Sequence, residues 1–262
     1  MFLQVAILTR VRHPNIVNLI GSCSEISTLV YEFLPNGSLE DRLACADNTS
    51  SLTWQARTRI ISEICLGLVF LHSNKPHLVI HGDLKPENIL LDANFVSKLS
   101  DFGISRIIKQ SDTNTTAFYR TIHPVGTFGY LDPQFLSTGE LTPKSDVYSF
   151  GIIVLRLLTG KRALNIASEV QEGMRTGRLL SIVDKSAGKW PFDVAKKLAK
   201  LGLRCVDISR RRRPDMSQVW ATIEPLVKVA PQSKALSFVG SSTFSEEHVP
   251  SHFICPILQV YI

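Results

Sequence analysis

Short apolar runs separated by turn residues characterise the first part of the chain. Apolar residues at helical spacing near the amino terminus predict a first helix, which His13-Pro14 ends. Apolar runs over 16–20 and 28–33 then predict two strands joined by a turn over 21–27. The sequence Pro35-Asn36-Gly37 is a strong turn signal. This part of the chain therefore predicts a small piece of sheet after one helix.

Helical spacing dominates from residue 54 onward. The stretch 54–72 predicts a long helix with one apolar face, made of Ile60, Ile61, Ile64, Leu68 and Leu71. Further helices are predicted over 144–159, 194–205 and 217–229. Most of the chain after the first strands is therefore expected to be helical.

Between residues 80 and 124 the sequence lacks long helical spacing and alternates short apolar runs with polar segments. Apolar runs over 88–91 and 96–99 predict short strands, which lie among loops that carry glycine and proline. The polar stretch 109–124 predicts a long loop. The Ser-rich stretch 231–248 has no periodicity and predicts a linker. Together these elements predict an α+β fold.

Composition narrows the class of protein. The 262 residues are 44% hydrophobic and 20% charged, as in a globular protein with a sizeable core. Lys and Arg number 29 and Asp and Glu 23, so the formal charge is +6. This mild excess suits anionic partners such as phosphates, and it is too diffuse to indicate a nucleic-acid partner.

Cysteine usage and hydropathy indicate the compartment. The five cysteines are scattered without a CxxC pair, which argues against a disulfide framework and a zinc site. No apolar run is long enough to cross a bilayer, and the first residues lack the features of a signal peptide. We therefore expect a cytoplasmic protein without a membrane span.

Two polar strings carry candidate chemistry: His81-Gly82-Asp83-Leu84-Lys85-Pro86-Glu87-Asn88 and Asp101-Phe102-Gly103. Phosphoryl transfer needs a carboxylate for the attacking hydroxyl, oxygen ligands for Mg²⁺ and positive charge near the phosphate. Asp83 can serve as the base, and Lys85 can neutralise charge on the γ-phosphate. Asn88 and Asp101 can supply the hard oxygen ligands that Mg²⁺ prefers.

These two strings resemble the catalytic loop and the metal-binding loop of protein kinases. The resemblance implies a kinase-like fold, with a mostly helical large lobe and an incomplete small β lobe. It also implies transfer of the ATP γ-phosphate to hydroxyls of a protein substrate, with Mg as cofactor. In kinases the residue at Asp146 accepts hydrogen bonds from backbone N–H groups of the catalytic loop.

The same resemblance assigns further site residues. Lys85 after Asp-Leu favours serine/threonine specificity, and Thr127 is expected beside Asp83 at the substrate hydroxyl. Tyr31 falls at the gatekeeper position of the hinge, where the backbone of Glu32 and Leu34 would meet adenine.

The sequence also departs from the kinase pattern at several positions. No Gly-rich loop and no Val-Ala-x-Lys strand precede His13, and the glutamate of the kinase C helix is expected at Gln4. Gly82 stands where many kinases have an arginine, as in the non-RD receptor-like kinases, so activation by loop phosphorylation is not expected. Gln134 replaces the glutamate that usually pairs with Arg213, so part of that charge assistance should be lost.

Landmarks in the second half resemble a plant receptor-like group, the proteins that join a kinase domain to a U-box. They are Trp190-Pro191-Phe192, Val219-Trp220, Glu224-Pro225-Leu226 and Pro250 to Ile257, the last of which resembles the beginning of a U-box. The resemblance implies a kinase domain over 1–229, a linker over 230–248 and an incomplete U-box over 249–262. Both domains are expected to be truncated.

Three functions stay open at this point. The first is a serine/threonine kinase, and the second is a catalytically impaired, pseudokinase-like interaction module, because the phosphate-gripping parts are missing. The third is an incomplete gene model of a ubiquitin ligase. That protein would bind a ubiquitin-conjugating enzyme only if a complete U-box exists.

Overall fold

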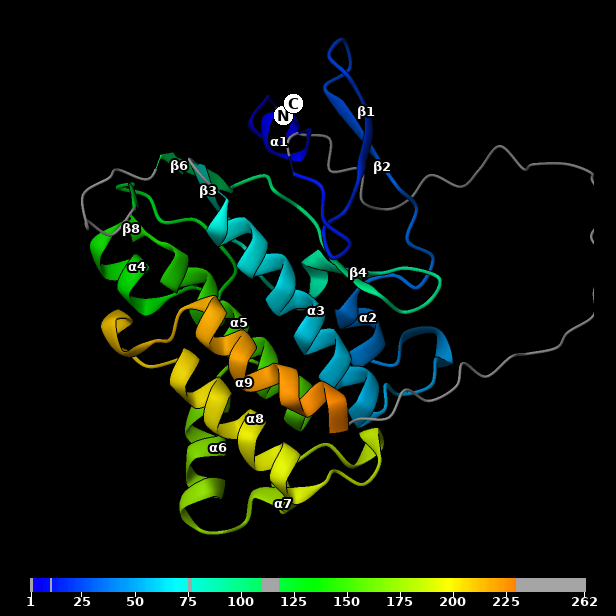
Figure 1. The fold of residues 1–262 in the computed structure, drawn as a ribbon, viewed down its shortest axis with the longest axis vertical. Coiled ribbons are helices and arrows are strands. Elements are labelled where there is room, and N and C mark those ends of the chain that lie inside the picture. The colour runs from blue at the N-terminus through cyan, green and yellow to red at the C-terminus, as the bar shows by residue number, and fades with distance from the viewer. Residues whose placement is uncertain (1, 10, 75–76, 110–117, 230–262) are drawn as a thin grey trace, which may run out of the picture.

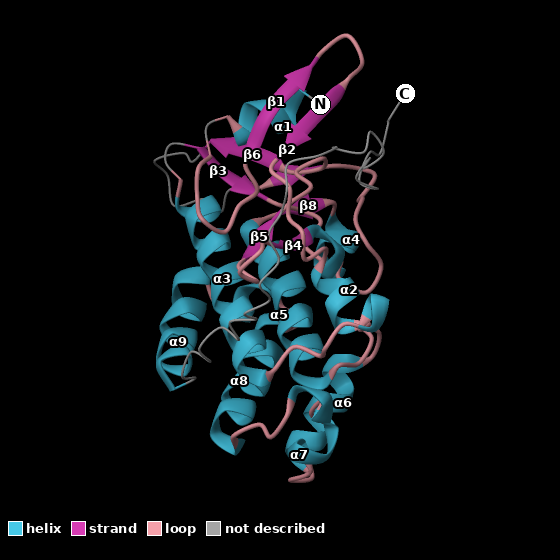
Figure 2. Ribbon diagram, turned by 90° about the vertical axis from the view of Figure 1, so that its right-hand side faces the viewer, coloured by secondary structure: helices cyan, strands magenta, loops and turns pink. Residues whose placement is uncertain are grey.

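A computed structural model describes residues 2–9, 11–74, 77–109 and 118–229. Figure 2 shows a β-hairpin and one short helix at one end of the molecule, and long helices through the remainder. The predicted linker over 230–248 and U-box segment over 249–262 lie outside the described residues.

The α-helices are α1 (Phe2–Leu8), α2 (Leu39–Leu43), α3 (Trp54–Ser73), α4 (Pro133–Thr138), α5 (Pro143–Thr159), α6 (Ile166–Arg175), α7 (Leu179–Ile182), α8 (Phe192–Cys205) and α9 (Met216–Val229). The strands are β1 (Leu19–Cys23), β2 (Thr28–Tyr31), β3 (His77–Ile80), β4 (Ile89–Leu91), β5 (Ser97–Leu99), β6 (Arg106–Lys109), β7 (Tyr119–Arg120) and β8 (Glu140–Leu141). Short 3₁₀ turns η1 (Ala46–Asn48), η2 (Pro86–Asn88), η3 (Lys185–Ala187) and η4 (Arg210–Arg212) complete the described elements. This mostly helical arrangement with short strands confirms the α+β prediction.

Four antiparallel pairs account for the strands: β1 with β2, β3 with β6, β4 with β5, and β7 with β8. The first predicted strand began at residue 16, whereas β1 begins at Leu19. Ile16 forms only an isolated bridge with Leu99, and the amide of Val17 donates to the Leu99 carbonyl. That apolar stretch therefore crosses from α1 to the hairpin while lying against β5.

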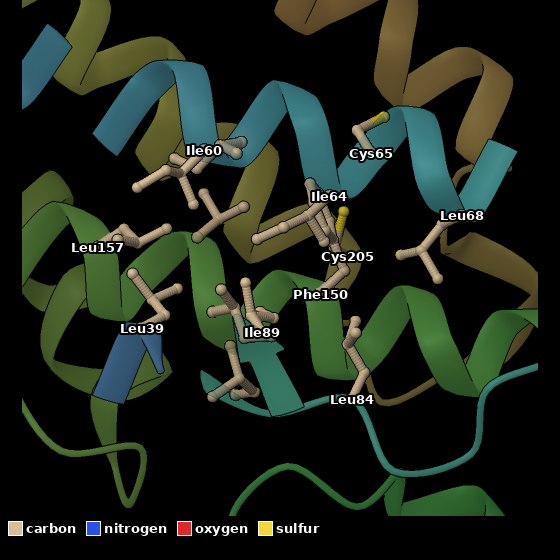
Figure 3. Packing of buried hydrophobic residues seen from close by; sticks show 14 of the residues in the cluster. Leu39, Ile60, Ile64, Cys65, Leu68, Leu84, Ile89, Phe150, Leu157 and Cys205 are labelled. Atoms are coloured by element: carbon tan, nitrogen blue, oxygen red, sulfur yellow. The ribbon is translucent and has the colours of Figure 1, made fainter. Parts of the chain in front are cut away.

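The long helices α3 and α5 run side by side, with α8 packed on α5 and α9 packed on α3 (Figure 1). All five residues of the predicted apolar face of α3 are at most 1% exposed. Figure 3 shows Ile60, Ile64 and Leu68 directed toward Phe150 and Leu157 of α5. Burial of each such side chain stabilises the fold by about 1.5–3 kcal/mol. These helices form the base that carries the loops described below.

The start and end of α5 follow from its sequence. Pro143 occupies the first turn, and the Thr142 backbone amide donates to the Ser145 hydroxyl at 3.3 Å. Gly160 ends the helix in the left-handed conformation at φ +69°, which glycine adopts without strain. Asp146 consequently lies in the first helical turn, where a negative charge is favourable.

Helices α5 and α8 approach each other through two glycines. A Cβ placed on Gly151 would lie 2.6 Å from Cys205 Cβ, and one on Gly202 would lie 2.5 Å from Leu155 Cδ2. We expect Gly151→Ala to lower the free energy of unfolding by about 1–3 kcal/mol, because the added methyl forces the helices apart. Urea unfolding measures this change. Gly21→Ala is the control, because a Cβ placed on Gly21 would have no neighbour within 4 Å, and an equal loss in both variants would contradict the packing argument.

None of the described helices combines the length and apolar character needed to span a bilayer. The cysteines within the described ranges, Cys23, Cys45, Cys65 and Cys205, are free thiols.

Candidate active site

The loop that begins at His81 is held by the carboxylate of Asp146. One oxygen accepts a hydrogen bond from the His81 amide and the other from the Gly82 amide, both at 2.9 Å. His72 of α3 adds a contact of 2.8 Å between its Nε2 and the same carboxylate. Asp146 is 1% exposed, so these partners replace the water that its charge has lost. The expected role of Asp146 matches this geometry.

Three predicted catalytic residues, Asp83, Lys85 and Thr127, come together at the end of this loop. The Thr127 hydroxyl donates to Asp83 Oδ1 at 2.8 Å. Lys85 Nζ lies 2.9 Å from the Thr127 hydroxyl and 3.2 Å from Asp83 Oδ2. The Asp83 and Lys85 side chains are 14% and 21% exposed, so the cluster is partly buried and partly open to solvent. A carboxylate, an ammonium and a hydroxyl thus converge on one point.

The predicted metal ligands Asn88 and Asp101 flank this cluster. The Asn88 amide nitrogen donates to the Asp83 carbonyl at 2.9 Å and to Asp83 Oδ2 at 3.2 Å. Its amide oxygen accepts no hydrogen bond from the other described residues, which leaves that oxygen available as a ligand. Asp101 is exposed and has φ +57°, with Oδ1 accepting from the Gly103 amide at 3.1 Å.

The neighbours of Asp101 fix its position. Phe102 is fully buried, and its ring centroid lies 5.0 Å from that of His81. The Ser100 backbone amide donates to the Asn88 backbone carbonyl at 2.9 Å, and this contact joins the two loops. No group of three His, Cys, Asp or Glu residues that could hold a metal occurs within the described ranges. An amide oxygen and one carboxylate are a donor set that fits Mg²⁺ when phosphates and water complete the coordination.

The predicted hinge residues Tyr31, Glu32 and Leu34 lie at the end of β2 and directly after it. Burial raises the pKa of Tyr31 to about 12, and the nearby Asp101 charge adds to that shift, so the phenol is neutral at physiological pH. The Glu32 carboxylate accepts from the Asn18 amide at 2.8 Å and from Lys98 Nζ at 2.9 Å. Neither the Glu32 carbonyl nor the Leu34 amide hydrogen-bonds to another described residue, and such an acceptor and donor suit a nucleotide base.

Gln4 of α1 lies against the same loop. A Cβ placed on Gly103 would be 3.1 Å from Gln4 Nε2. The position expected for the helix glutamate therefore lies beside Gly103, and it carries a neutral amide in place of a carboxylate.

The expectation for Arg213 was wrong in one respect. We expected Gln134 to leave Arg213 with reduced charge assistance, whereas Arg213 pairs with Asp132 at 2.7 Å and both side chains are fully buried. Gln134 instead accepts a hydrogen bond from the Arg210 amide at 2.6 Å. The carboxylate that pairs with Arg213 therefore lies two positions before Gln134, and Asp132 also caps α4 by accepting from the Gln134 backbone amide.

Sequence reasoning also missed a second buried network. Arg156 of α5 bonds Glu40 of α2 and the hydroxyl of Tyr130. An arginine within an otherwise apolar run of α5 is the one local signal that could have indicated a buried polar cluster there.

Comparisons with known proteins agree with the predicted resemblance. The sequence model of the protein kinase domain matches residues 2–222. U-box domain-containing protein 70 of Oryza sativa subsp. japonica is 61% identical over 259 residues, which are 98% of this chain and 32% of that protein. U-box domain-containing protein 33 of Arabidopsis thaliana is 52% identical over 262 residues, 98% of this chain and 30% of that protein.

A third relative, U-box domain-containing protein 57 of Oryza sativa subsp. japonica, is 48% identical over 258 residues, 97% of this chain and 48% of that protein. The chain thus spans about a third of the length of the first two relatives and about half of the third. The kinase-domain match covers most of the chain and coincides with the helices and loops described above. The chain therefore belongs to the protein kinase family.

Proposed function

We propose that this chain carries the catalytic site of a serine/threonine protein kinase, which transfers the γ-phosphate of Mg·ATP to hydroxyls of a protein substrate. The observation that supports this function best is the convergence of Asp83, Lys85 and Thr127 within hydrogen-bond distance of one another. A carboxylate that orients a hydroxyl and a cation that stabilises phosphate charge are two of the protein groups that phosphoryl transfer requires.

Each residue of the cluster has a distinct task in this proposal. Asp83 accepts the proton of the substrate hydroxyl and orients the hydroxyl oxygen toward the phosphate. Lys85 stabilises the negative charge that develops on the transferred group. Thr127 holds the Asp83 carboxylate and the Lys85 ammonium in place beside the substrate hydroxyl. Lys85 after Asp-Leu favours serine and threonine as acceptors.

The nucleotide would be held from two sides. The Glu32 carbonyl and the Leu34 amide, next to Tyr31, would bind the adenine edge. Asn88 and Asp101 would hold Mg²⁺, and the bound ion supplies neutralisation of charge on the phosphate oxygens.

We expect Asp101→Asn to weaken Mg²⁺-dependent binding of ATP by roughly tenfold or more, about 1.4 kcal/mol, because the metal loses its anionic protein ligand. Isothermal titration calorimetry of residues 1–262 with and without Mg²⁺ measures the change. Asp193→Asn is the matched control, because Asp193 is an exposed carboxylate on α8, far along the chain from the site. Unchanged magnesium dependence in Asp101→Asn would reject the metal assignment.

The second candidate function is a pseudokinase-like interaction module. It is favoured by Gln4, whose neutral amide lies against Gly103 where a carboxylate would pair with a phosphate-gripping lysine. Phosphoamino acid analysis after incubation with labelled ATP and a protein substrate separates the two candidates. Phosphoserine or phosphothreonine supports the kinase, whereas Mg·ATP binding without any phosphoamino acid supports the module.

We also propose that this site is not activated by loop phosphorylation, as in non-RD receptor-like kinases. Gly82 has φ +84°, and a Cβ there would meet the Ile104 carbonyl oxygen at 3.4 Å. Arg106, a nearby cation, donates to the Ile104 and Ser105 carbonyls and lies 4.5 Å from the centre of the Tyr119 ring. Its guanidinium is therefore already occupied by protein groups.

The relatives' names suggest a role in ubiquitin ligation for a longer protein. We propose that residues 1–229 form its kinase domain, 230–248 a linker and 249–262 the start of a U-box. A complete U-box would bind a ubiquitin-conjugating enzyme, and the kinase domain would recognise or modify the client protein in the cytoplasm.

A further inference from the structure

Arg156 joins three segments that are far apart in the sequence. Its guanidinium donates to both carboxylate oxygens of Glu40 on α2, at 2.6 Å and 3.2 Å, and to the Tyr130 hydroxyl at 2.5 Å. Its Nε donates to the Lys161 carbonyl at 3.1 Å, just beyond the end of α5. Arg156 is only 7% exposed, so its charge depends on these partners instead of water.

Tyr130 links Arg156 to the cluster of Asp83, Lys85 and Thr127. The amides of Tyr130 and Leu131 both donate to the Thr127 carbonyl at 3.1 Å, which closes a turn over 127–131. The Tyr130 carbonyl accepts from the Ser149 hydroxyl of α5 at 2.8 Å. Thr127, at the start of the turn, donates to Asp83 at 2.8 Å. A continuous path of contacts therefore leads from Glu40 to the carboxylate of Asp83.

The electrostatics suit a fixed anchor. Burial raises the pKa of Tyr130 to about 12 even though the Arg156 contact opposes that shift, so the phenol is neutral and can accept from the guanidinium. Glu40 supplies the negative charge, and its contacts raise the pKa of Arg156 against the effect of burial. The planar fork of a guanidinium fixes direction as well as distance, which a lysine ammonium cannot do.

We propose that Arg156 is a positioning residue for phosphoryl transfer: held by Glu40, it fixes Tyr130 and thereby the turn that sets Thr127 on Asp83. This inference rests on the proposed kinase function for its role and on the contacts above for its geometry. Arg57 provides the contrast. It is also buried and bonds the Leu157 carbonyl and Asp184, but these contacts lead away from residues 127–131.

The test is amide hydrogen exchange of residues 1–262. Tyr130→Phe removes only the hydroxyl, and we expect exchange of the Tyr130 and Leu131 amides to become roughly tenfold faster while α5 keeps its protection. Arg156→Met should act in the same way, and Arg156→Lys should restore part of the protection. Tyr148→Phe is the matched control, because the Tyr148 hydroxyl bonds none of the described residues and its ring keeps its place over Arg213.

Two exchange results would overturn the proposal. The first is unchanged exchange at both amides in Tyr130→Phe. The second is a uniform increase throughout α5, which would mean that the network supports the helix and not the turn. The exchange result is independent of catalysis, so it decides the geometry even if the wild-type chain transfers no phosphate and the proposed function fails. Where transfer is measured, the proposal requires a lower kcat with an unchanged KM for ATP, and an unchanged kcat would also overturn it.

Discussion

Asp132→Asn is expected to lower the free energy of unfolding by about 3–5 kcal/mol. The Asp132 and Arg213 side chains are fully buried and lie 2.7 Å apart. Asparagine keeps the size and shape of the side chain, so the loss comes from the charge. Arg213 would then be a cation buried without a counterion. This cost is a large fraction of the roughly 5–15 kcal/mol by which domains are stable.

The other contacts of Asp132 raise the cost of the change. One carboxylate oxygen of Asp132 also accepts from the Gln134 backbone amide at 2.9 Å, and the other accepts from the Ser145 hydroxyl at 3.0 Å. The carboxylate thus connects the start of α4, the first turn of α5 and the segment before α9. Asparagine can replace one of these acceptor oxygens but offers a donor amide where the other stood.

Urea unfolding followed by circular dichroism measures the effect of Asp132→Asn. Glu169→Gln is the matched control, because it makes the same carboxylate-to-amide change in the half-exposed pair of Glu169 with Lys161, where at most about 1 kcal/mol is expected. A double variant of Asp132→Asn with Arg213→Met should lose less free energy of unfolding than the sum of the two single losses. Each single change leaves the other group buried without its partner. Equal losses in Asp132→Asn and Glu169→Gln would refute this role.

Local patterns predicted the long helices well because their stabilising contacts repeat along the sequence. The apolar spacing of 54–72 corresponds to α3, which ends one residue later. Helix α6 was not predicted, although Ile166 and Val170 are buried at helical spacing, because most of the rest of that helix is polar and faces solvent. Short strands such as β3 and β7 were missed because each depends on a partner strand distant in sequence.

The proximity of Asp83, Lys85 and Asn88 was predictable because these residues lie in one contiguous string, and their catalytic roles stay predictions. The buried ion pairs were not predictable, because their partners are far apart. Asp132 and Arg213 are 81 positions apart, and Glu40 and Arg156 are 116 positions apart. No local pattern indicates which charge meets which across such distances, so the fold had to be known first.

The largest effect on activity is expected for Asp83→Asn, which should slow phosphotransfer by roughly 10²–10⁴-fold. The amide keeps the side-chain volume but cannot accept the hydroxyl proton. Folding should be nearly unaffected, because the Asp83 side chain is partly exposed and Lys85 keeps its contact with Thr127. Absolute rates should be low even for the wild type. Kinases bind the nucleotide phosphates in part through a Gly-rich loop, and residues 1–12 of the 1–262 polypeptide contain no glycine.

Transfer of labelled γ-phosphate from Mg·ATP to a protein substrate, compared between wild-type 1–262 and Asp83→Asn, tests the central claim most directly. Asp193→Asn is carried through the same purification to control for contaminating kinases. We predict label on serine or threonine with the wild type and with Asp193→Asn, and its loss with Asp83→Asn. Equal labelling by all three proteins, or no labelling by a wild-type chain that binds Mg·ATP, would contradict the assignment of Asp83 as the base of an active kinase.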